Sequence, residues 1–134
     1  MRLLVCGGRD WRDQARMDAA LDAVHRKHGV TLLIEGGQVS RDRDADELYG
    51  ADWQAGTWAI RRRVPHWTCW PQWHDENGHI RKSAGPERNA RMLAIGRPDA
   101  AVAMPGGKGT RNMVRRLRDA GVPVWEPYTP EAGA

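Results

Sequence analysis

One short stretch of the sequence, residues 105–110 (PGGKGT), combines residue types that bind phosphate. It lies between an apolar run, residues 100–104, and a stretch with helical periodicity, residues 111–120, so a buried strand is predicted to turn into a helix at its glycines. A helix N-terminus offers unpaired backbone N–H groups and a partial positive charge, and glycines let an anion approach that backbone closely. The predicted anion-binding residues are Gly106, Gly107, Lys108, Gly109 and Thr110.

The side chains of this stretch favour the same chemistry. Lys108 adds a full positive charge and Thr110 a hydroxyl group, and both groups bind phosphate oxygens. The simpler interpretation is a tight turn, which is all that the glycine pair would indicate by itself. The strand, the glycines, the basic residue and the helix together favour the phosphate site.

Two other glycine pairs also follow apolar runs. The pair at 7–8 comes after residues 2–6, and the pair at 36–37 comes after residues 30–35. In a parallel α/β sheet the carboxyl ends of all strands lie at one edge, so the three turns are predicted to converge on one crevice. The ligand-binding residues predicted at the first two turns are Gly7, Gly8, Arg9, Asp10, Gly36 and Gly37.

The elements that position these turns alternate between strand and helix patterns. Strands are predicted near residues 2–6, 30–35, 64–69, 99–104 and 122–126, separated by stretches of helix length. This alternation predicts an α/β fold with five parallel strands and helices on both faces of the sheet.

Capping residues mark the predicted helix boundaries. The first helix carries apolar residues at three- and four-residue spacing, with Asp10 or Asp13 as its N-cap and Gly29 at its end. A second helix is predicted to begin at Gly50, and another at Ser83.

Three segments have no clear period. Residues 38–49 are dense in charges of both signs and are predicted to form a solvated loop or a short helix over the crevice. Residues 70–79 are predicted to form a long loop whose tryptophans, Trp70 and Trp73, line a pocket wall, stack on a base or pack in the core. Residues 128–134 are predicted to form a flexible tail.

Two sets of residues have the composition of metal ligands but not the spacing. The carboxylates between residues 42 and 47 lack the glycine and spacing of a calcium loop. His66, Cys69, His74 and His79 fit none of the compact zinc patterns, and two strand residues three apart point to opposite faces. We therefore expect neither a metal site nor a cofactor.

The composition limits the class of protein and of partner. The 134 residues are 40% hydrophobic and 28% charged, as in an ordinary globular protein, and one domain is predicted over residues 1–127. The net charge of +4 favours an anionic partner, either a nucleotide or a nucleic acid. No apolar run is long enough for a membrane span or a secretory signal, and Cys6 and Cys69 are too few for a disulfide scaffold. We expect a cytoplasmic protein with no membrane partner.

Five short motifs together resemble those of the SLOG superfamily, most closely its small YspA/YpsA-related branch. They occur in the same order and with similar spacing over most of the chain. The resemblance implies a Rossmann-like three-layer sandwich with a mostly parallel five-stranded sheet, a nucleotide or nucleotide-derived ligand, and a homo-oligomer, in the form of a homodimer. The motifs are residues 7–11 (GGRDW), 35–37 (EGG), 50–52 (GAD), 84–89 (AGPERN) and 105–110 (PGGKGT).

Within this superfamily, the Lonely Guy phosphoribohydrolases cleave the N-glycosidic bond of nucleoside 5′-monophosphates. Their arginine motif is similar to residues 88–92 (RNARM), and their glycine motif is similar to residues 106–110. The resemblance implies further ligand-binding residues, namely Asp52, Ser83, Gly85, Arg88 and Asn89.

This sequence departs from the hydrolases at the position of their catalytic glutamate, which is Met113 here. A thioether can neither stabilise an oxocarbenium ion nor deprotonate water, so the hydrolase mechanism would need a carboxylate from Glu35, Asp52 or Glu87. The candidate catalytic residues are Arg88 and Glu35. The segment 38–49 is also absent from most of the small branch, so it is interpreted as an insertion that affects ligand choice.

Three functions agree with these residues. The complete phosphate loop and the missing glutamate favour a protein that binds a nucleotide-derived molecule, as a sensor, carrier or sequestering protein. The first alternative is an N-glycosidase or phosphoribohydrolase acting on nucleoside 5′-monophosphates. The second is binding of single-stranded DNA through the basic helix face of Arg111, Arg115 and Arg118.

Overall fold

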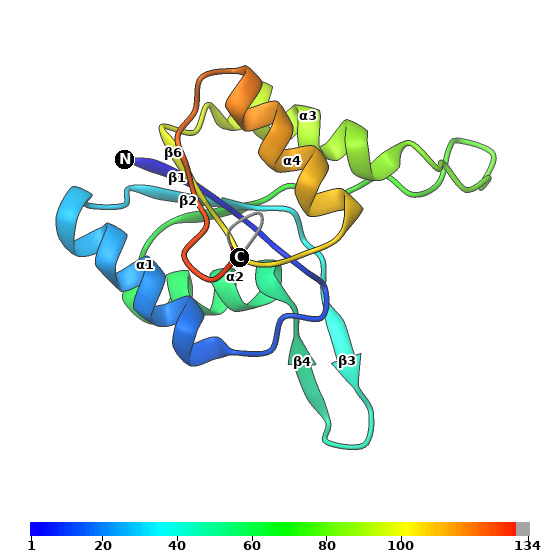
Figure 1. Cartoon of the computed structure of the whole chain (residues 1–134). Coiled ribbons are helices and arrows are strands. Elements are labelled where there is room, and N and C mark those ends of the chain that lie inside the picture. Colours follow the sequence, from blue (N-terminus) through cyan, green and yellow to red (C-terminus); the bar gives the residue numbers. More distant parts are fainter. Residues whose placement is uncertain (131–134) are drawn as a thin grey trace.

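One sheet of five parallel strands runs through the centre of the structure, a computed structural model that describes residues 1–130 (Figure 1). The strands follow the spatial order β5-β2-β1-β6-β7, and every pair of neighbours is parallel. The predicted α/β fold with a five-stranded parallel sheet is therefore confirmed. The strands are β1 (Arg2–Cys6), β2 (Leu32–Glu35), β5 (His66–Thr68), β6 (Ala100–Ala103) and β7 (Val124–Trp125).

Four helices of the described chain cover the sheet, two on each face, and make the predicted three-layer sandwich (Figure 1). In the central strand β1, Leu3 and Val5 pack with α1 and α2, whereas Leu4 and Cys6 pack with α3 and α4, because successive side chains point to opposite faces. No helix within residues 1–130 combines the length and the apolar character needed to span a membrane. The helices are α1 (Gln14–His28), α2 (Ala51–Arg62), α3 (Ala84–Gly96) and α4 (Lys108–Asp119).

The first helix, α1, begins at one of the two predicted N-cap residues, Asp13, and ends at Gly29 as predicted. The Asp13 carboxylate accepts the backbone N–H of Arg16 at 3.0 Å, and the N–H of Gly29 closes the last turn on the carbonyl of His25 at 2.8 Å. The last long helix, α4, begins at Lys108 rather than near residue 111, so part of the predicted glycine loop forms its first helical turn.

Residues 38–49 form neither the predicted loop nor a short helix. They form an antiparallel hairpin of β3 (Ser40–Asp42) and β4 (Glu47–Tyr49), which projects away from the three layers in Figure 1. The Asp42 carboxylate closes the turn by accepting two backbone N–H groups of the turn, at 3.0 and 3.1 Å. Both strands are short and largely exposed, so no apolar alternation marks them in the sequence.

The chain remains packed beyond the predicted domain boundary at residue 127. The ring of Tyr128 stacks on the ring of Trp11, with centroids 5.8 Å apart, and its hydroxyl donates to the carbonyl of Arg16 at 2.9 Å. Tyr128 therefore belongs to the packed structure, although the predicted tail includes it. The last residues of that predicted tail, 131–134, lie outside the described residues.

Candidate functional site

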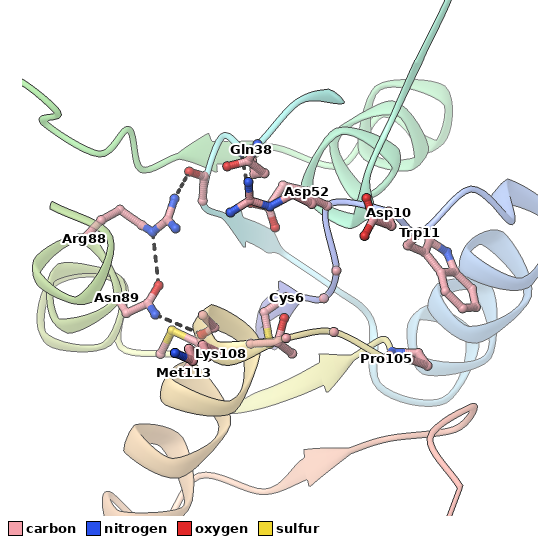
Figure 2. Close-up of a pocket in the computed structure, with 18 of the residues that line it drawn as sticks. Cys6, Asp10, Trp11, Gln38, Asp52, Arg88, Asn89, Pro105, Lys108 and Met113 are labelled. Carbon is pink, nitrogen blue, oxygen red and sulfur yellow. Dashed lines mark hydrogen bonds between the residues drawn. The ribbon is translucent and has the colours of Figure 1, made fainter. Parts of the chain in front are cut away.

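The turns after β1, β2 and β6 meet at the carboxyl edge of the sheet and line one cavity of about 670 Å³ (Figure 2). A volume of this order is typical of small-molecule sites. The residues predicted to bind a ligand that line this cavity are Gly7, Gly8, Arg9, Asp10, Gly36, Asp52, Arg88, Asn89, Gly106, Gly107, Lys108, Gly109 and Thr110. The predicted site residues that do not line it are Glu35, Gly37, Ser83 and Gly85.

The first and last glycine turns are in direct contact. The backbone N–H of Gly8 donates to the carbonyl of Pro105 at 2.9 Å. A Cβ atom on Gly106 would lie against the hydroxyl of Thr110 and 2.8 Å from the backbone nitrogen of Gly8. Glycine is therefore required at position 106, because the two turns leave no room for a side chain between them.

The N-terminus of α4 is open toward the cavity. Its N-cap is Gly107, which has no side chain to accept the first N–H groups of the helix. A Cβ atom on Gly107 or Gly109 would meet no described atom within 4 Å. By contrast, the first N–H of α2, from Ala51, donates to the carbonyl of Gly8 at 3.1 Å. An anion can therefore approach the first turn of α4 directly.

Two side chains of α3 connect the second glycine turn to this helix terminus. The Arg88 guanidinium donates to the carbonyl of Gly36 and to the side-chain oxygen of Asn89. The amide of Asn89 in turn donates to the carbonyl of Gly109 at 3.3 Å and to the side-chain oxygen of Asn112 at 3.1 Å. Figure 2 shows Arg88 and Asn89 on one side of the cavity, where these bonds hold the charge of Arg88 in place.

Asp52 is a buried carboxylate that lines the cavity from the first turn of α2. It accepts the backbone N–H of Gln38 at 3.0 Å. Burial raises the pKa of Asp52 to about 7, and the nearby charge of Glu35 acts in the same direction. The hydrogen bond from Gln38 and the charge of Arg88 oppose this rise. Asp52 therefore gains and loses a proton near neutral pH.

Glu35, a candidate catalytic residue in the sequence, lies outside the cavity lining. Its carboxylate accepts the hydroxyl of Thr68 and the backbone N–H of Gly37, the latter at 2.6 Å. Burial raises its pKa, and these two hydrogen bonds oppose the rise. Because Thr68 belongs to β5, the carboxylate connects two strands of the sheet rather than facing the cavity.

Ser83 and Glu87, at the start of α3, contact each other and do not line the cavity. The hydroxyl of Ser83 donates to Glu87 at 2.8 Å, and Glu87 also pairs with Arg81. Among the three carboxylates considered as replacements for the hydrolase glutamate, Asp52 is thus the one that lines the cavity.

The cavity is also lined by residues that were not predicted to bind the ligand. Pro105 and Met113 lie in or beside the last glycine motif, and the others are Cys6, Trp11, Gln38 and Met92. Burial raises the pKa of the Cys6 thiol, which therefore stays protonated at neutral pH. Trp11 follows the first glycine turn directly, and its place in the GGRDW motif is the feature that could have selected it. The tryptophans predicted as wall candidates, Trp70 and Trp73, do not line the cavity.

A parallel sheet with a glycine-lined cavity at the carboxyl ends of its strands defines a Rossmann-like α/β protein. A family model described as the YspA, cpYpsA-related SLOG family matches residues 1–75, and the chain belongs to this family. The predicted relationship to the SLOG superfamily is therefore confirmed, and membership suggests nucleotide-related binding or processing. The match contains the first two glycine turns and Asp52, whereas Arg88 and residues 105–110 lie beyond it. None of the curated proteins compared with this chain matched it.

Proposed function

We propose that this protein binds a nucleotide or a nucleotide-derived small molecule, as a sensor, carrier or sequestering protein. The observation that supports the proposal is the open N-terminus of α4, where Lys108 and the glycines of residues 106–109 line one cavity. Such a terminus binds phosphate through backbone N–H groups, the helix dipole and a full positive charge together.

The charges around the cavity favour an anionic ligand. Three cationic side chains line it, from Arg9, Arg88 and Lys108, against two carboxylates, from Asp10 and Asp52. Since the pKa of Asp52 is about 7, this carboxyl group is partly protonated at neutral pH. The net charge of the cavity lining is therefore more positive than the +1 obtained when both carboxylates are counted as ionised. A phosphate joined to a ribose would supply both the negative charge and hydroxyl groups that Asp52 can bind.

Binding without cleavage is the expected activity. Met113 is buried and lines the cavity at the position that the glutamate occupies in the similar Lonely Guy motif. Its thioether carries no charge and exchanges no proton, so it cannot assist departure of a base or attack by water. The ligand would therefore leave the site unchanged.

One observation favours a second function, cleavage of the N-glycosidic bond of nucleoside 5′-monophosphates. Asp52 lines the cavity with a pKa of about 7, which suits a general base that activates water. In this mechanism Arg88 would hold the phosphate or the ribose, and Asp52 would replace the missing glutamate.

One experiment separates these two functions. The purified chain is mixed with a panel of nucleoside 5′-monophosphates, calorimetry measures binding, and chromatography measures free base. We expect binding without release of base. Base released at enzymatic rates, and no longer released by Arg88→Ala, would establish the glycosidase instead. If no member of the panel binds, and mass spectrometry finds no nucleotide-derived molecule in the purified protein, both functions are wrong.

Single-stranded DNA is the third ligand considered. On the basic face of α4, Arg111 and Arg115 are exposed, but Arg118 pairs with Glu126 at 2.8 Å. A strand of DNA that covers several arginines would bind with an affinity that falls steeply with salt concentration, whereas a mononucleotide would show a shallow dependence. Titrations of both ligands at two salt concentrations distinguish the two cases.

A further inference from the structure

The indole of Trp11 is held in one orientation at the cavity. Its ring N–H donates to the carbonyl of Asp13 at 3.1 Å. Its backbone N–H donates to the carbonyl of Gly8 at 3.2 Å, and its carbonyl accepts the N–H of Gly50 at 2.9 Å. These bonds tie the residue to the first glycine turn and to the start of α2. Because the ring is already held in place, Trp11 would lose little conformational entropy when a ligand contacts it.

Tyr128 supports this indole from one side. The two rings are nearly parallel, with an angle of 16° between their planes and 5.8 Å between their centroids. The Tyr128 hydroxyl donates to the carbonyl of Arg16 at 2.9 Å, and the Arg16 guanidinium lies 5.2 Å from the centre of the tyrosine ring. Tyr128 thus covers part of the Trp11 ring, and Trp11 is one of the residues that line the cavity.

The position of Trp11 suits the end of a ligand whose phosphate lies at α4. Figure 2 shows Trp11 and Arg88 at opposite ends of the cavity. The volume of about 670 Å³ is far larger than a phosphate group requires, so a ligand held at the phosphate site has room to extend toward the indole. A rigid, flat and largely apolar surface in this position is suited to a planar heteroaromatic ring.

We propose that Trp11, supported by Tyr128, is the stacking surface for the base of the ligand, so that the site selects nucleotides over sugar phosphates that have no base. This inference rests on the proposed function, because a phosphate at α4 sets the position of the base. Stacking uses the face of a base rather than its hydrogen-bonding edge, so all four common bases are accepted, and purines bind more tightly than pyrimidines because their rings are larger.

The test compares ribose 5-phosphate with adenosine 5′-monophosphate by calorimetry on the full chain. We expect the wild type to bind the mononucleotide about tenfold more tightly, which is within the range for stacking of one base. Trp11→Leu keeps an apolar side chain against the core but removes the aromatic ring. We expect it to lower this affinity ratio to nearly one while leaving the affinity for ribose 5-phosphate unchanged.

Two further variants sharpen the comparison. Trp11→Phe keeps a smaller ring, so it should show an intermediate ratio. Trp73→Leu changes an exposed tryptophan outside the cavity and should leave the ratio at the wild-type value. Circular dichroism and thermal unfolding establish that each variant is folded, and if Trp11→Leu is not, the ratio measured for Trp11→Phe provides the test.

The outcomes separate the inference from the function on which it rests. Equal affinity of the wild type for both ligands would overturn the stacking role while leaving the phosphate site in place. A ratio that the Trp11 variants leave unchanged would do the same. If the wild type binds neither ligand, the stacking role of Trp11 is wrong, and the proposed function is then decided by the panel of nucleotides and the mass spectrometry described above.

Discussion

The side-chain amide of Asn89 donates to the backbone carbonyl of Gly109 across 3.3 Å, and this bond joins α3 to the first turn of α4. Asn89 is buried and also bonds to Arg88 and to Asn112. The arginine of one motif and the glycine loop of another are thus held in a set arrangement by hydrogen bonds within the protein.

Asn89→Ala should destabilise the fold. It removes the hydrogen bonds to Arg88, Gly109 and Asn112, and buried polar groups left without a partner cost free energy, so we expect a loss of roughly 2 kcal/mol in the free energy of unfolding. Urea denaturation followed by circular dichroism measures it. Asn77→Ala, at an exposed position, is the control and should change the free energy by less than about 0.5 kcal/mol. Equal stabilities of the two variants would contradict this role of Asn89.

Gly107→Asp should abolish nucleotide binding without unfolding the protein. An aspartate at the N-cap of α4 would itself accept first-turn N–H groups and would place a negative charge where the phosphate binds. Its Cβ would meet no described atom within 4 Å, so the free energy of unfolding should be unchanged or higher. Calorimetry with nucleoside 5′-monophosphates measures the loss of binding.

Gly107→Asn is the neutral variant that matches this aspartate in shape. We expect it to bind nucleotide more tightly than Gly107→Asp, and the difference should shrink as salt screens the added charge. If Gly107→Asp binds as tightly as the wild type, the loop does not hold a phosphate and its glycines form only a turn.

Arg88→Ala should weaken nucleotide binding by roughly 1.5–3 kcal/mol, the range for a charge-assisted hydrogen bond. Arg88→Lys keeps the charge but loses the planar set of donors, so it should restore only part of the affinity. Arg91→Ala, on the same helix, is the control, because Arg91 donates to the carbonyl of Trp70 and does not line the cavity. Calorimetry that finds the same affinity for both alanine variants would remove Arg88 from the phosphate site.

Asp52 should make the stability of the protein depend on pH. Its pKa is about 7 in the folded chain against 3.8 for an exposed carboxyl group, so ionisation disfavours the folded state. This cost is absent at low pH, grows as the pH rises between these two values, and is constant above the folded pKa. Asp52→Asn cannot ionise, so its stability relative to the wild type should increase from pH 5 to pH 7, by at most about 1.4 kcal/mol per pH unit. Urea titrations across this range check it, and a difference that does not vary with pH would mean that the pKa is not raised.

The chain should form a homodimer in solution. Several large apolar side chains are between 62% and 75% exposed, namely Ile60, Trp70, Ile80 and Ile95. Association of two copies would remove part of this apolar surface from water. Light scattering at micromolar concentration should therefore give about twice the 15.1 kDa mass of one chain. A mass equal to that of one chain would show a monomer.

Local chemistry in the sequence determined the layers of this fold. The sequence alone predicts the apolar runs, the glycine pairs at their ends and the Asp13 cap. Such features can be predicted because strand period, helix period and capping preferences act over a few residues. The meeting of three glycine turns at one edge followed from the parallel sheet itself, which puts the carboxyl ends of its strands on the same side.

Tertiary packing decided features that have no local period. The hairpin of β3 and β4 has largely exposed strands, and its Asp42 pairs with Arg12 of a distant segment at 2.9 Å. Trp11, rather than Trp70 or Trp73, lines the cavity, and its carbonyl accepts the N–H of Gly50 at 2.9 Å. Such contacts join segments distant in the sequence, so no short window of residues encodes them.

The roles of the carboxylates were also decided by the tertiary structure. Glu35 and Asp52 are both buried, and both have a raised pKa. The sequence places Glu35 before the second glycine pair and Asp52 two residues after Gly50, but Glu35 is bound by Thr68 of the neighbouring strand, whereas Asp52 lines the cavity. Burial and hydrogen-bond partners come from other parts of the chain, and only the folded protein therefore separates a carboxylate that lines the cavity from one that joins two strands.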